Sequence, residues 1–170
     1  MSKSELEVSK NKILDGSISI FQPKKGFRVS IDSILLSSSI KEYSNCMEFG
    51  TGSGIIIIYL SKKFPSSKII GVEKNIELVK LANKNLLKNN INSINSKILC
   101  NDLFNKPFLQ EYNNKLDRVI MNPPYFISNN VIKSNNKFKA SARYESDINE
   151  WFVAAYKKLK PKGYMNFVFR

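Results

Sequence analysis

From residue 46 onward, short apolar segments alternate with longer segments that carry apolar residues at helical spacing. This alternation is typical of β-α-β units, in which the strands form a parallel sheet and the connecting helices cover its faces. The chain of 170 residues is long enough for one domain with a single core. We therefore expect an α/β domain with one functional site, and the apolar segments predict strands at Cys46–Phe49, Lys68–Glu73, Ser96–Cys100, Asp117–Met121 and Gly163–Phe169.

Two segments between these strands have the apolar periodicity of helices. The segment from Ile76 to Leu87 presents an apolar face, and Asn75 can cap its start. The segment from Ile148 to Lys160 carries a stripe that includes Trp151 and ends before a Pro-Lys-Gly stop. Both segments are predicted to be helices that pack on the sheet.

The run Ile55–Ile58 poses a conflict, because β-branched residues favour strands. It follows a glycine loop that itself follows a strand, which is the position of the first crossover helix in doubly wound folds. We therefore predict a helix. Ahead of it, Ile18–Phe21 is expected to be extended, Gln22–Gly26 to be a turn and Asp32–Ser39 to be a short helix.

A formal net charge of +13 favours a polyanionic partner, because Lys and Arg gain affinity for phosphates by releasing counterions. Nucleic acid is the obvious candidate. The chain is also rich in Asn, Ile and Lys, a bias that coding DNA rich in A and T produces on its own. Charge therefore points to a nucleic-acid partner without establishing it.

Histidine is absent, and the two cysteines, Cys46 and Cys100, both lie in segments expected to be buried strands. A zinc site or a histidine-based triad lacks its side chains, and a disulfide framework is not expected. No apolar run approaches the roughly 20 residues that cross a bilayer, and Met1–Asp15 lacks the apolar core of a secretory signal. We expect a cytoplasmic protein without a metal or membrane partner.

The segment Glu48–Gly54 reads Glu-Phe-Gly-Thr-Gly-Ser-Gly and lies between the first predicted strand and the first predicted helix. Gly50, Gly52 and Gly54 let a ligand approach the backbone closely. Dinucleotide-binding and P-loop proteins use related turns, and a purely structural turn also fits. The P-loop lysine is missing, and Glu73 at the end of the second strand is placed to bind ribose hydroxyls. The loop therefore favours a nucleoside cofactor.

Two further polar segments follow strands. Asn101-Asp102-Leu103 follows the third strand, where Asp102 can accept a hydrogen bond from an adenine amino group or serve as a turn residue. Asn122-Pro123-Pro124-Tyr125 follows the fourth and is more specific. Its prolines fix the backbone, so that the Asn122 side chain and the Pro123 carbonyl can address one ligand nitrogen.

A conjugated amine is a poor nucleophile because its lone pair is delocalised. Hydrogen bonds from the amine to Asn122 and Pro123 favour a more localised lone pair, and Tyr125 can stack on the flat target. Positioning then supplies much of the rate, and no strong base is required.

Together these motifs resemble the class I S-adenosylmethionine-dependent methyltransferases of the Asn-Pro-Pro-Tyr group, which have a Rossmann-like sheet and modify planar amines of adenine, cytosine or glutamine. The resemblance implies that the target is served by Asn122, Pro123 and Tyr125. It also implies contacts to the cofactor: the methionine part by Glu48, Gly50, Gly52 and Gly54, the ribose by Glu73, and the adenine by Asp102 with its neighbour Leu103.

Within that group, the segment Phe21–Leu36 resembles the N-terminal signature of the tRNA1(Val) adenine-N6 methyltransferases, as does Phe126 directly after the motif and Ala142–Glu145 further on. The resemblance implies methylation of an adenine in the anticodon loop of a valine tRNA. There the base needs only local flipping to stack on an aromatic side chain. By analogy, a cover over the cofactor is expected from Arg28, Ser30 and Asp32, although Asp32 is equally suited to start a helix. Phosphate contacts or ordinary solvated surface are expected from Lys24, Lys25, Lys133, Lys137 and Lys139.

We divide the chain into residues 1–45, an N-terminal segment that covers the cofactor, and residues 46–170, the methyltransferase core. The family normally continues with two more strands after the fifth. We therefore expect a truncated sheet in which residues 167–169 lie on an exposed edge that can associate with another chain.

Three other functions compete. A release-factor glutamine N5-methyltransferase shares the glycine loop and the Asn-Pro-Pro-Tyr chemistry, but its usual N-terminal helical domain is not seen. A DNA adenine methyltransferase would need a target-recognition domain, for which there is no room. A non-catalytic RNA-binding remnant would keep the basic surface and lose turnover.

Overall fold

The central element of the computed structural model is a sheet of five parallel strands in the order β5-β4-β3-β6-β7. The structure describes residues 6–26, 28–103, 109–123 and 148–168. The chain forms β3, β4 and β5 in one direction across the sheet and then places β6 and β7 on the other side of β3. The strands are β3 (Asn45–Phe49), β4 (Lys68–Glu73), β5 (Ser96–Cys100), β6 (Leu116–Met121) and β7 (Leu159–Phe167).

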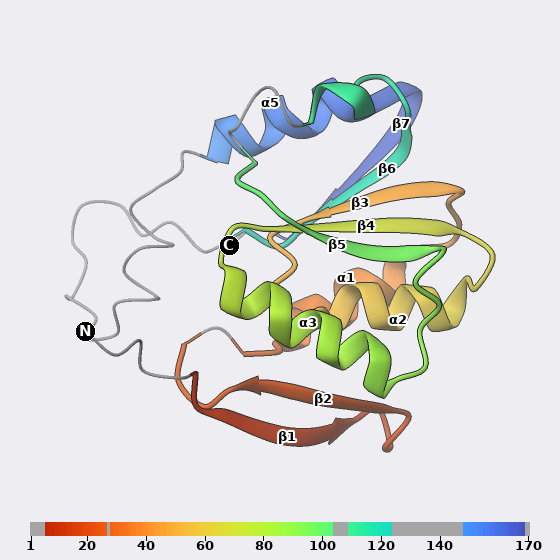
Figure 1. Ribbon diagram of the computed structural model, residues 1–170. Helices are drawn as coiled ribbons and strands as arrows, with labels where there is room; N and C mark the ends of the chain where they lie inside the picture. The colour runs from red at the N-terminus through yellow and green to blue at the C-terminus, as the bar shows by residue number, and fades with distance from the viewer. Residues whose placement is uncertain (1–5, 27, 104–108, 124–147, 169–170) are drawn as a thin grey trace, which may run out of the picture.

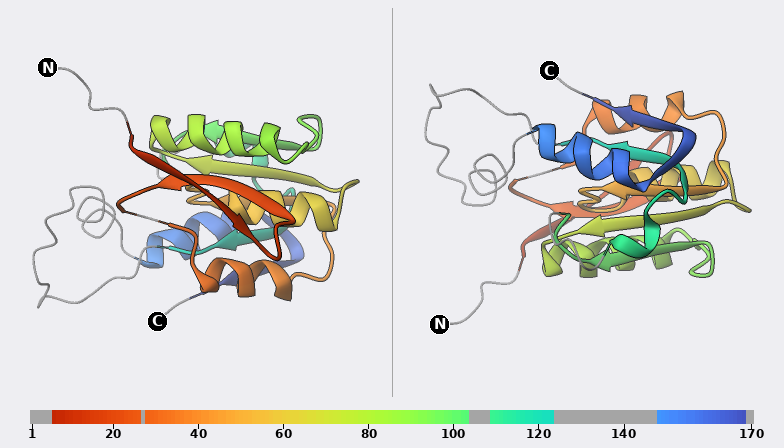
Figure 2. Two further views of the ribbon diagram at one scale, coloured as in Figure 1. Left: turned by 90° about the horizontal axis from the view of Figure 1, so that it is seen from below. Right: turned by 90° about the horizontal axis from the view of Figure 1, so that it is seen from above.

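The layers around the sheet are seen in Figure 1. Three helices cover one face, and α5 with the short 3-10 helix η1 lies on the other. A two-stranded antiparallel hairpin packs outside the layer of three helices and runs across α2 in the view from below (Figure 2, left). These elements are β1 (Val8–Ile13), β2 (Ile18–Pro23), α1 (Ile31–Ser39), α2 (Ile55–Lys63), α3 (Ile76–Lys88), η1 (Gln110–Tyr112) and α5 (Ile148–Lys158).

Strand β3 divides the core in two. Cys46 belongs to the cluster under the three helices, whereas Met47 and Phe49 belong to the cluster under α5. This alternation follows from the period of two along a strand. Both faces of a parallel sheet are covered, which explains why the strands read as nearly continuous apolar runs.

The isoleucine run is helical, as predicted. All four side chains of Ile55–Ile58 are buried, with exposures of 5% or less. The helix lies between the sheet and the hairpin, so its surroundings are apolar on both sides. Burial of that area outweighs the small helix propensity cost of β-branched residues.

Two asparagines of α3 hold the hairpin against the helices. The Asn85 amide accepts from the Phe21 N–H (2.7 Å) and donates to the Phe21 carbonyl (2.7 Å), while Asn89 binds both backbone groups of Ser19 at 3.0 and 2.7 Å. Asn85 also donates to the carbonyl of Ser53 in the glycine loop at 2.8 Å. The backbone N–H and carbonyl groups of Ser19 and Phe21 at the outer edge of β2 thus bond to side-chain amides rather than to a third strand.

The sequence expectations for the regular elements are largely confirmed, with five corrections. Strand β1 was not predicted, and Gln22 and Pro23 belong to β2 rather than to a turn. The last helix ends at Lys158, and β7 begins at Leu159 instead of Gly163. The expected helix stop is a bulge within β7, where Lys162 has a φ of 63° and the register with β6 shifts. Cys100 is exposed.

The outer edge of the sheet at β7 carries exposed aromatic side chains. Tyr164 is 64% and Phe167 is 44% exposed, in agreement with the expected apolar edge. Val168 packs partly against the core, and Phe169 lies outside the described residues. Within the described ranges, no helix is long and apolar enough to cross a membrane.

We predict that Asn85→Ala lowers the free energy of unfolding by about 3 kcal/mol, because it leaves buried backbone groups of Phe21 and Ser53 without partners. Urea denaturation measures this loss. The matched control is Asn83→Ala on the same helix, where the exposed amide binds only the Val79 carbonyl. An equal effect of the two substitutions would contradict the role of Asn85.

Candidate functional site

Four strand ends meet at one edge of the sheet. Because β3, β4, β5 and β6 are parallel, the residues that follow them lie side by side in the order of the strands. The order reverses between β3 and β6, and ligands of open α/β sheets bind at such a switch point. Apart from the expected cover residues Arg28, Ser30 and Asp32, and from Glu48 inside β3, the described site residues predicted from the sequence follow or end one of these strands.

The glycine loop turns back onto β4 directly after β3. The N–H groups of Gly50 and Thr51 both donate to the Val72 carbonyl, at 2.9 and 3.2 Å. Gly50, Gly52 and Gly54 all have positive φ, at 71°, 58° and 88°, which other residues adopt at a cost. Gly54 then serves as the N-cap of α2, so the loop leads into the start of a helix.

Glu73 connects three of the predicted segments. Its carboxylate accepts hydrogen bonds from the N–H of Gly52 and of Asn75, both at 2.9 Å. Its backbone carbonyl accepts from Asn101 N–H at 3.0 Å. The glycine loop, the start of α3 and the end of β5 are therefore fixed relative to one another by one residue, whose exposure is 9%.

Close packing explains why three positions near the loop are glycine. A Cβ at Gly50 would lie 3.0 Å from the Trp151 ring of α5, and one at Gly54 would lie 3.3 Å from the Cβ of Ala82. A Cβ at Gly71 of β4 would overlap Thr51 and Ile57. In contrast, no atom of the described residues lies within 4 Å of a Cβ built on Gly52, so these residues leave the space beside the middle of the loop open.

Glu48 is an acidic side chain inside the sheet. It lies on β3 between Gly71 and Ile120 of the neighbouring strands and is 2% exposed. Burial raises its pKa well above the usual range, and the negative charge of Glu73 adds to this shift. The nearby Thr51 hydroxyl offsets only part of it. Glu48 is therefore protonated in a pH range where an exposed glutamate is charged.

Asn122 follows β6 and is half-buried, and Pro123 after it is buried. The Asn122 amide donates from Nδ2 to the hydroxyl of Ser33 in the first turn of α1, at 3.0 Å. Sequence reasoning did not single out Ser33, although it lies within the segment Phe21–Leu36. Pro124 and Tyr125, and with them the stacking predicted for Tyr125, lie outside the described residues.

The other predicted residues are placed less centrally. Arg28 is exposed, and its Nη2 donates to Asn11 of the hairpin at 3.5 Å. Asp102 is exposed and Leu103 half-buried, both just beyond β5. The start of α1 is capped by Ser30 rather than by Asp32.

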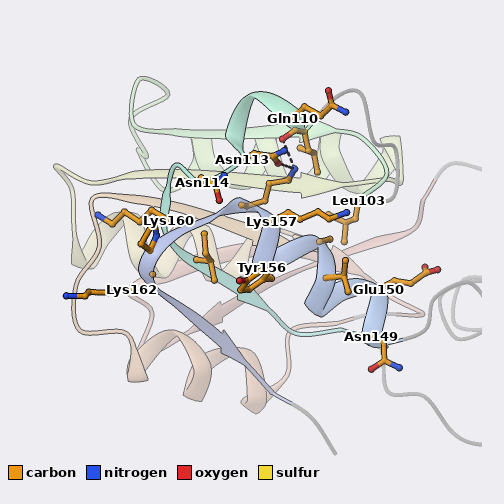
Figure 3. Close-up of a pocket in the computed structure, with 17 residues that line it drawn as sticks. Leu103, Gln110, Asn113, Asn114, Asn149, Glu150, Tyr156, Lys157, Lys160 and Lys162 are labelled. Carbon is orange, nitrogen blue, oxygen red and sulfur yellow. Dashed lines mark hydrogen bonds between the residues drawn. The ribbon is translucent and has the colours of Figure 1, made fainter.

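A groove of about 990 Å³ lies on the other side of the sheet, where α5, the beginning of β7 and the η1 region meet (Figure 3). Of the predicted site residues, only Leu103 lines it. Lys158 is buried there and donates to the Leu109 carbonyl at 2.7 Å and to Asn113 at 2.5 Å. Its pKa is lowered, chiefly by burial.

The comparisons with known proteins identify the family. The model of the methyltransferase small domain family matches residues 28–170. The chain belongs to this family. It is 30% identical over 130 residues to a protein of a Flavobacteriaceae bacterium (strain 3519-10) named tRNA1(Val) (adenine(37)-N6)-methyltransferase, and the match covers 75% of the chain and 52% of that relative.

A second relative carries a different name. Protein MJ0928 of Methanocaldococcus jannaschii, a candidate protein N5-glutamine methyltransferase, is 35% identical over 96 residues, which cover 55% of this chain and 44% of the relative. The chain thus spans about half the length of these curated relatives.

Solved structures share the Rossmann-like fold. A crystal structure from Methanococcus maripaludis, described as a candidate S-adenosyl-L-methionine-dependent methyltransferase (mmp1179), has a TM-score of 0.59 and covers 82% of this chain and 55% of its own, at 20% identity. The crystal structure of TYW2 from P. horikoshii in complex with MeSAdo has a TM-score of 0.66 and covers 99% of this chain and 54% of its own, at 13% identity. The family and the sheet predicted from the sequence are therefore confirmed.

Several buried polar atoms at the strand ends have no hydrogen-bond partner among the described residues. They are the acceptor Oε2 of Glu48, the hydroxyl of Thr51 and the acceptor Oδ1 of Asn101. Buried polar atoms are normally satisfied, so unsatisfied ones beside an open loop indicate a polar ligand. This set of oxygens, with the carboxylate of Glu73, fits the ammonium and hydroxyl groups of S-adenosylmethionine.

We predict that Glu48→Gln becomes more stable than the natural chain as the pH rises. Because the pKa of Glu48 is higher in the folded than in the unfolded state, its stabilising contribution is complete below the unfolded pKa and is lost as the pH rises through the folded pKa. Between the unfolded and the folded pKa of Glu48, the free energy of unfolding of the natural chain should fall by about 1.4 kcal/mol per pH unit relative to that of the variant.

Urea denaturation from pH 4 to pH 8 measures this difference. The exposed Glu42→Gln variant supplies the effect of losing one surface carboxylate. A stability difference between Glu48→Gln and the natural chain that stays constant with pH would contradict a raised pKa at Glu48.

Proposed function

We propose that this methyltransferase binds S-adenosylmethionine at the strand ends and transfers its methyl group to N6 of an adenine in tRNA. The observation that carries the proposal is the placement of Asn122 and Pro123 after β6, beside the glycine loop that follows β3, at the switch point of the sheet. The cofactor loop and a motif suited to planar amines therefore lie on adjacent strands.

The cofactor residues are assigned by chemistry and position. Glu73 would bind the ribose hydroxyls, and the glycine loop would allow the cofactor to approach the backbone where the space beside Gly52 is open. Glu48 would bind the methionine part, with its unpaired Oε2 as the acceptor. Asp102 and Leu103 would contact the adenine, and Arg28 would belong to the cover formed by the N-terminal residues before position 46.

The acceptor side needs hydrogen-bond acceptors rather than a base. When bound, S-adenosylmethionine supplies a methyl group on a positively charged sulfur. The oxygen of the Asn122 amide and the carbonyl of Pro123 would accept hydrogen bonds from the two hydrogens of the target amine, which localises the lone pair on nitrogen. Tyr125 would stack on the base and hold the nitrogen in line for attack.

Support for tRNA comes from two sources. The relative that matches three quarters of this chain is named as a tRNA adenine methyltransferase, whereas the match to the candidate glutamine methyltransferase covers 55% of the chain. The net charge of +13 suits binding to a phosphate backbone. Binding to a release factor or to a small acceptor does not require such an excess of positive charge. The glutamine methyltransferase remains the second candidate, because it uses the same amine chemistry and is named among the relatives.

We predict transfer of labelled methyl from S-adenosylmethionine into unmodified tRNA, recovered as N6-methyladenine after digestion. Asn122→Ala should lower kcat about 100-fold or more, because it removes an acceptor that acts on the reacting amine. Asn83→Ala, an exposed asparagine on α3, is the matched control and should retain full activity.

The same assay with a release factor as the acceptor separates the candidates. Label in the protein and none in tRNA would establish glutamine methylation instead. Binding of the cofactor without label in either acceptor would support the non-catalytic remnant and overturn the proposed activity.

A further inference from the structure

Ser33 is linked to Asn122 by a hydrogen bond although the two residues are 89 positions apart. Ser33 lies in the first turn of α1 and is 8% exposed. Its hydroxyl accepts from the Asn122 Nδ2 at 3.0 Å. The amide at the end of β6 is therefore held by a side chain from the N-terminal segment, outside the sheet.

The orientation of the Asn122 amide decides what it can bind. The amide has a donor end, Nδ2, and an acceptor end, Oδ1, and the two exchange places when the group turns over. A target amine donates hydrogens, so it requires Oδ1. An amide with the opposite orientation would present its own NH₂ group to the amine and repel it.

The Ser33 hydroxyl has a second hydrogen-bond partner, the hydroxyl of Ser30. The Ser30 hydroxyl oxygen caps α1 by accepting the Ser33 N–H at 3.3 Å, and it lies 3.3 Å from the Ser33 hydroxyl oxygen. When Ser33 donates its hydroxyl hydrogen to Ser30, only its lone pairs face Asn122. These lone pairs can accept from Nδ2 but cannot donate to Oδ1.

The backbone around Ser33 is held from two sides. The Ser37 hydroxyl donates to the Ser33 carbonyl at 2.6 Å. The Val29 N–H, just before the helix, donates to the buried Gln22 of the hairpin at 2.9 Å. A residue that orients another side chain must itself be fixed, and the start of α1 meets this requirement.

We propose that Ser33 is a positioning residue of the methyl-transfer reaction. Its hydroxyl fixes the Asn122 amide with Nδ2 toward α1 and leaves Oδ1 for the acceptor amine. This inference rests on the proposed transfer to a planar amine, and it applies equally whether that amine belongs to adenine or to glutamine.

The experiment compares Ser33→Ala with Ser33→Thr and with Ser39→Ala. Ser33→Ala should lower kcat about tenfold with little change in the KM for the acceptor, the size expected for one lost orienting hydrogen bond. Ser33→Thr keeps a hydroxyl and should recover most of this loss. Ser39→Ala removes a hydroxyl of the same helix that donates to the Leu36 carbonyl at 2.7 Å, and it should leave kcat unchanged.

A second readout does not require activity. The side-chain NH₂ signals of Asn122 in a ¹⁵N-resolved spectrum, assigned by their loss in Asn122→Ala, should shift in Ser33→Ala and return in Ser33→Thr. Unchanged Asn122 signals in Ser33→Ala, or an equal loss of kcat in Ser39→Ala, would overturn the role of Ser33.

The two readouts keep the failures apart. If the natural chain methylates neither tRNA nor a release factor, the proposed function is wrong, and the Asn122 signals still decide whether Ser33 holds the amide. If the natural chain is active and Ser33→Ala has the same kcat, only the inference about Ser33 is wrong.

Discussion

The hydrogen bonds of Asn85 join the parts of this protein that the sequence keeps apart. One buried amide on α3 binds the backbone of β2 and a carbonyl of the glycine loop. Its donors and acceptor are all used, which is the condition under which a buried polar side chain stabilises a fold. The hairpin, the helix layer and the loop therefore share one anchor, and α1 follows the hairpin into contact with Asn122.

The sheet edge shows a contrast between Glu73 and Glu48. Glu73 is well satisfied, because its carboxylate accepts two backbone N–H groups. Glu48 is fully buried and its Oε2 has no partner among the described residues, so it costs stability in its charged form. This loss of stability at Glu48 is explained if a positively charged group of a ligand pairs with the carboxylate. Buried polar groups that lower the stability of a fold are usual at sites that bind a ligand.

Much of the core was predictable from the sequence, because strands of a sheet that is buried on both faces are nearly continuous apolar runs. β4 and β5 have the predicted bounds, and Ile55–Ile58 was assigned to a helix by its place after a glycine loop. The extended segment Ile18–Phe21 was predicted and lies in β2, but its partner β1 was missed because Lys and Asn interrupt the apolar pattern of β1. The Asp15-Gly16 pair, which forms its turn with positive φ at both residues, is the signal that favours a hairpin there.

The site was predictable only where one motif contained it. The residues of the glycine loop, Glu73 and Asn122 were recognisable because each directly follows or ends a strand. The contacts between distant segments were not, since nothing in the spacing of Ser33 and Asn122 or of Asn85 and Phe21 announces that they meet. Such pairs depend on how α1 and the hairpin pack, which is a tertiary property.

The position of Ser33 bears on how the proposed site would distinguish acceptors. Under the proposed function, Asn122 and Pro123 would address the amine alone, and adenine and glutamine would present the same pair of amine hydrogens to them. Discrimination between acceptors must then come from groups that surround the amine. The helix α1 belongs to the N-terminal segment and contacts Asn122 through Ser33. Through Ser33, the N-terminal segment would affect the orientation of the Asn122 amide. This segment is also the part of the chain where proteins that methylate different acceptors can differ in sequence. On this argument, the choice of substrate depends on packing around the motif more than on the motif itself.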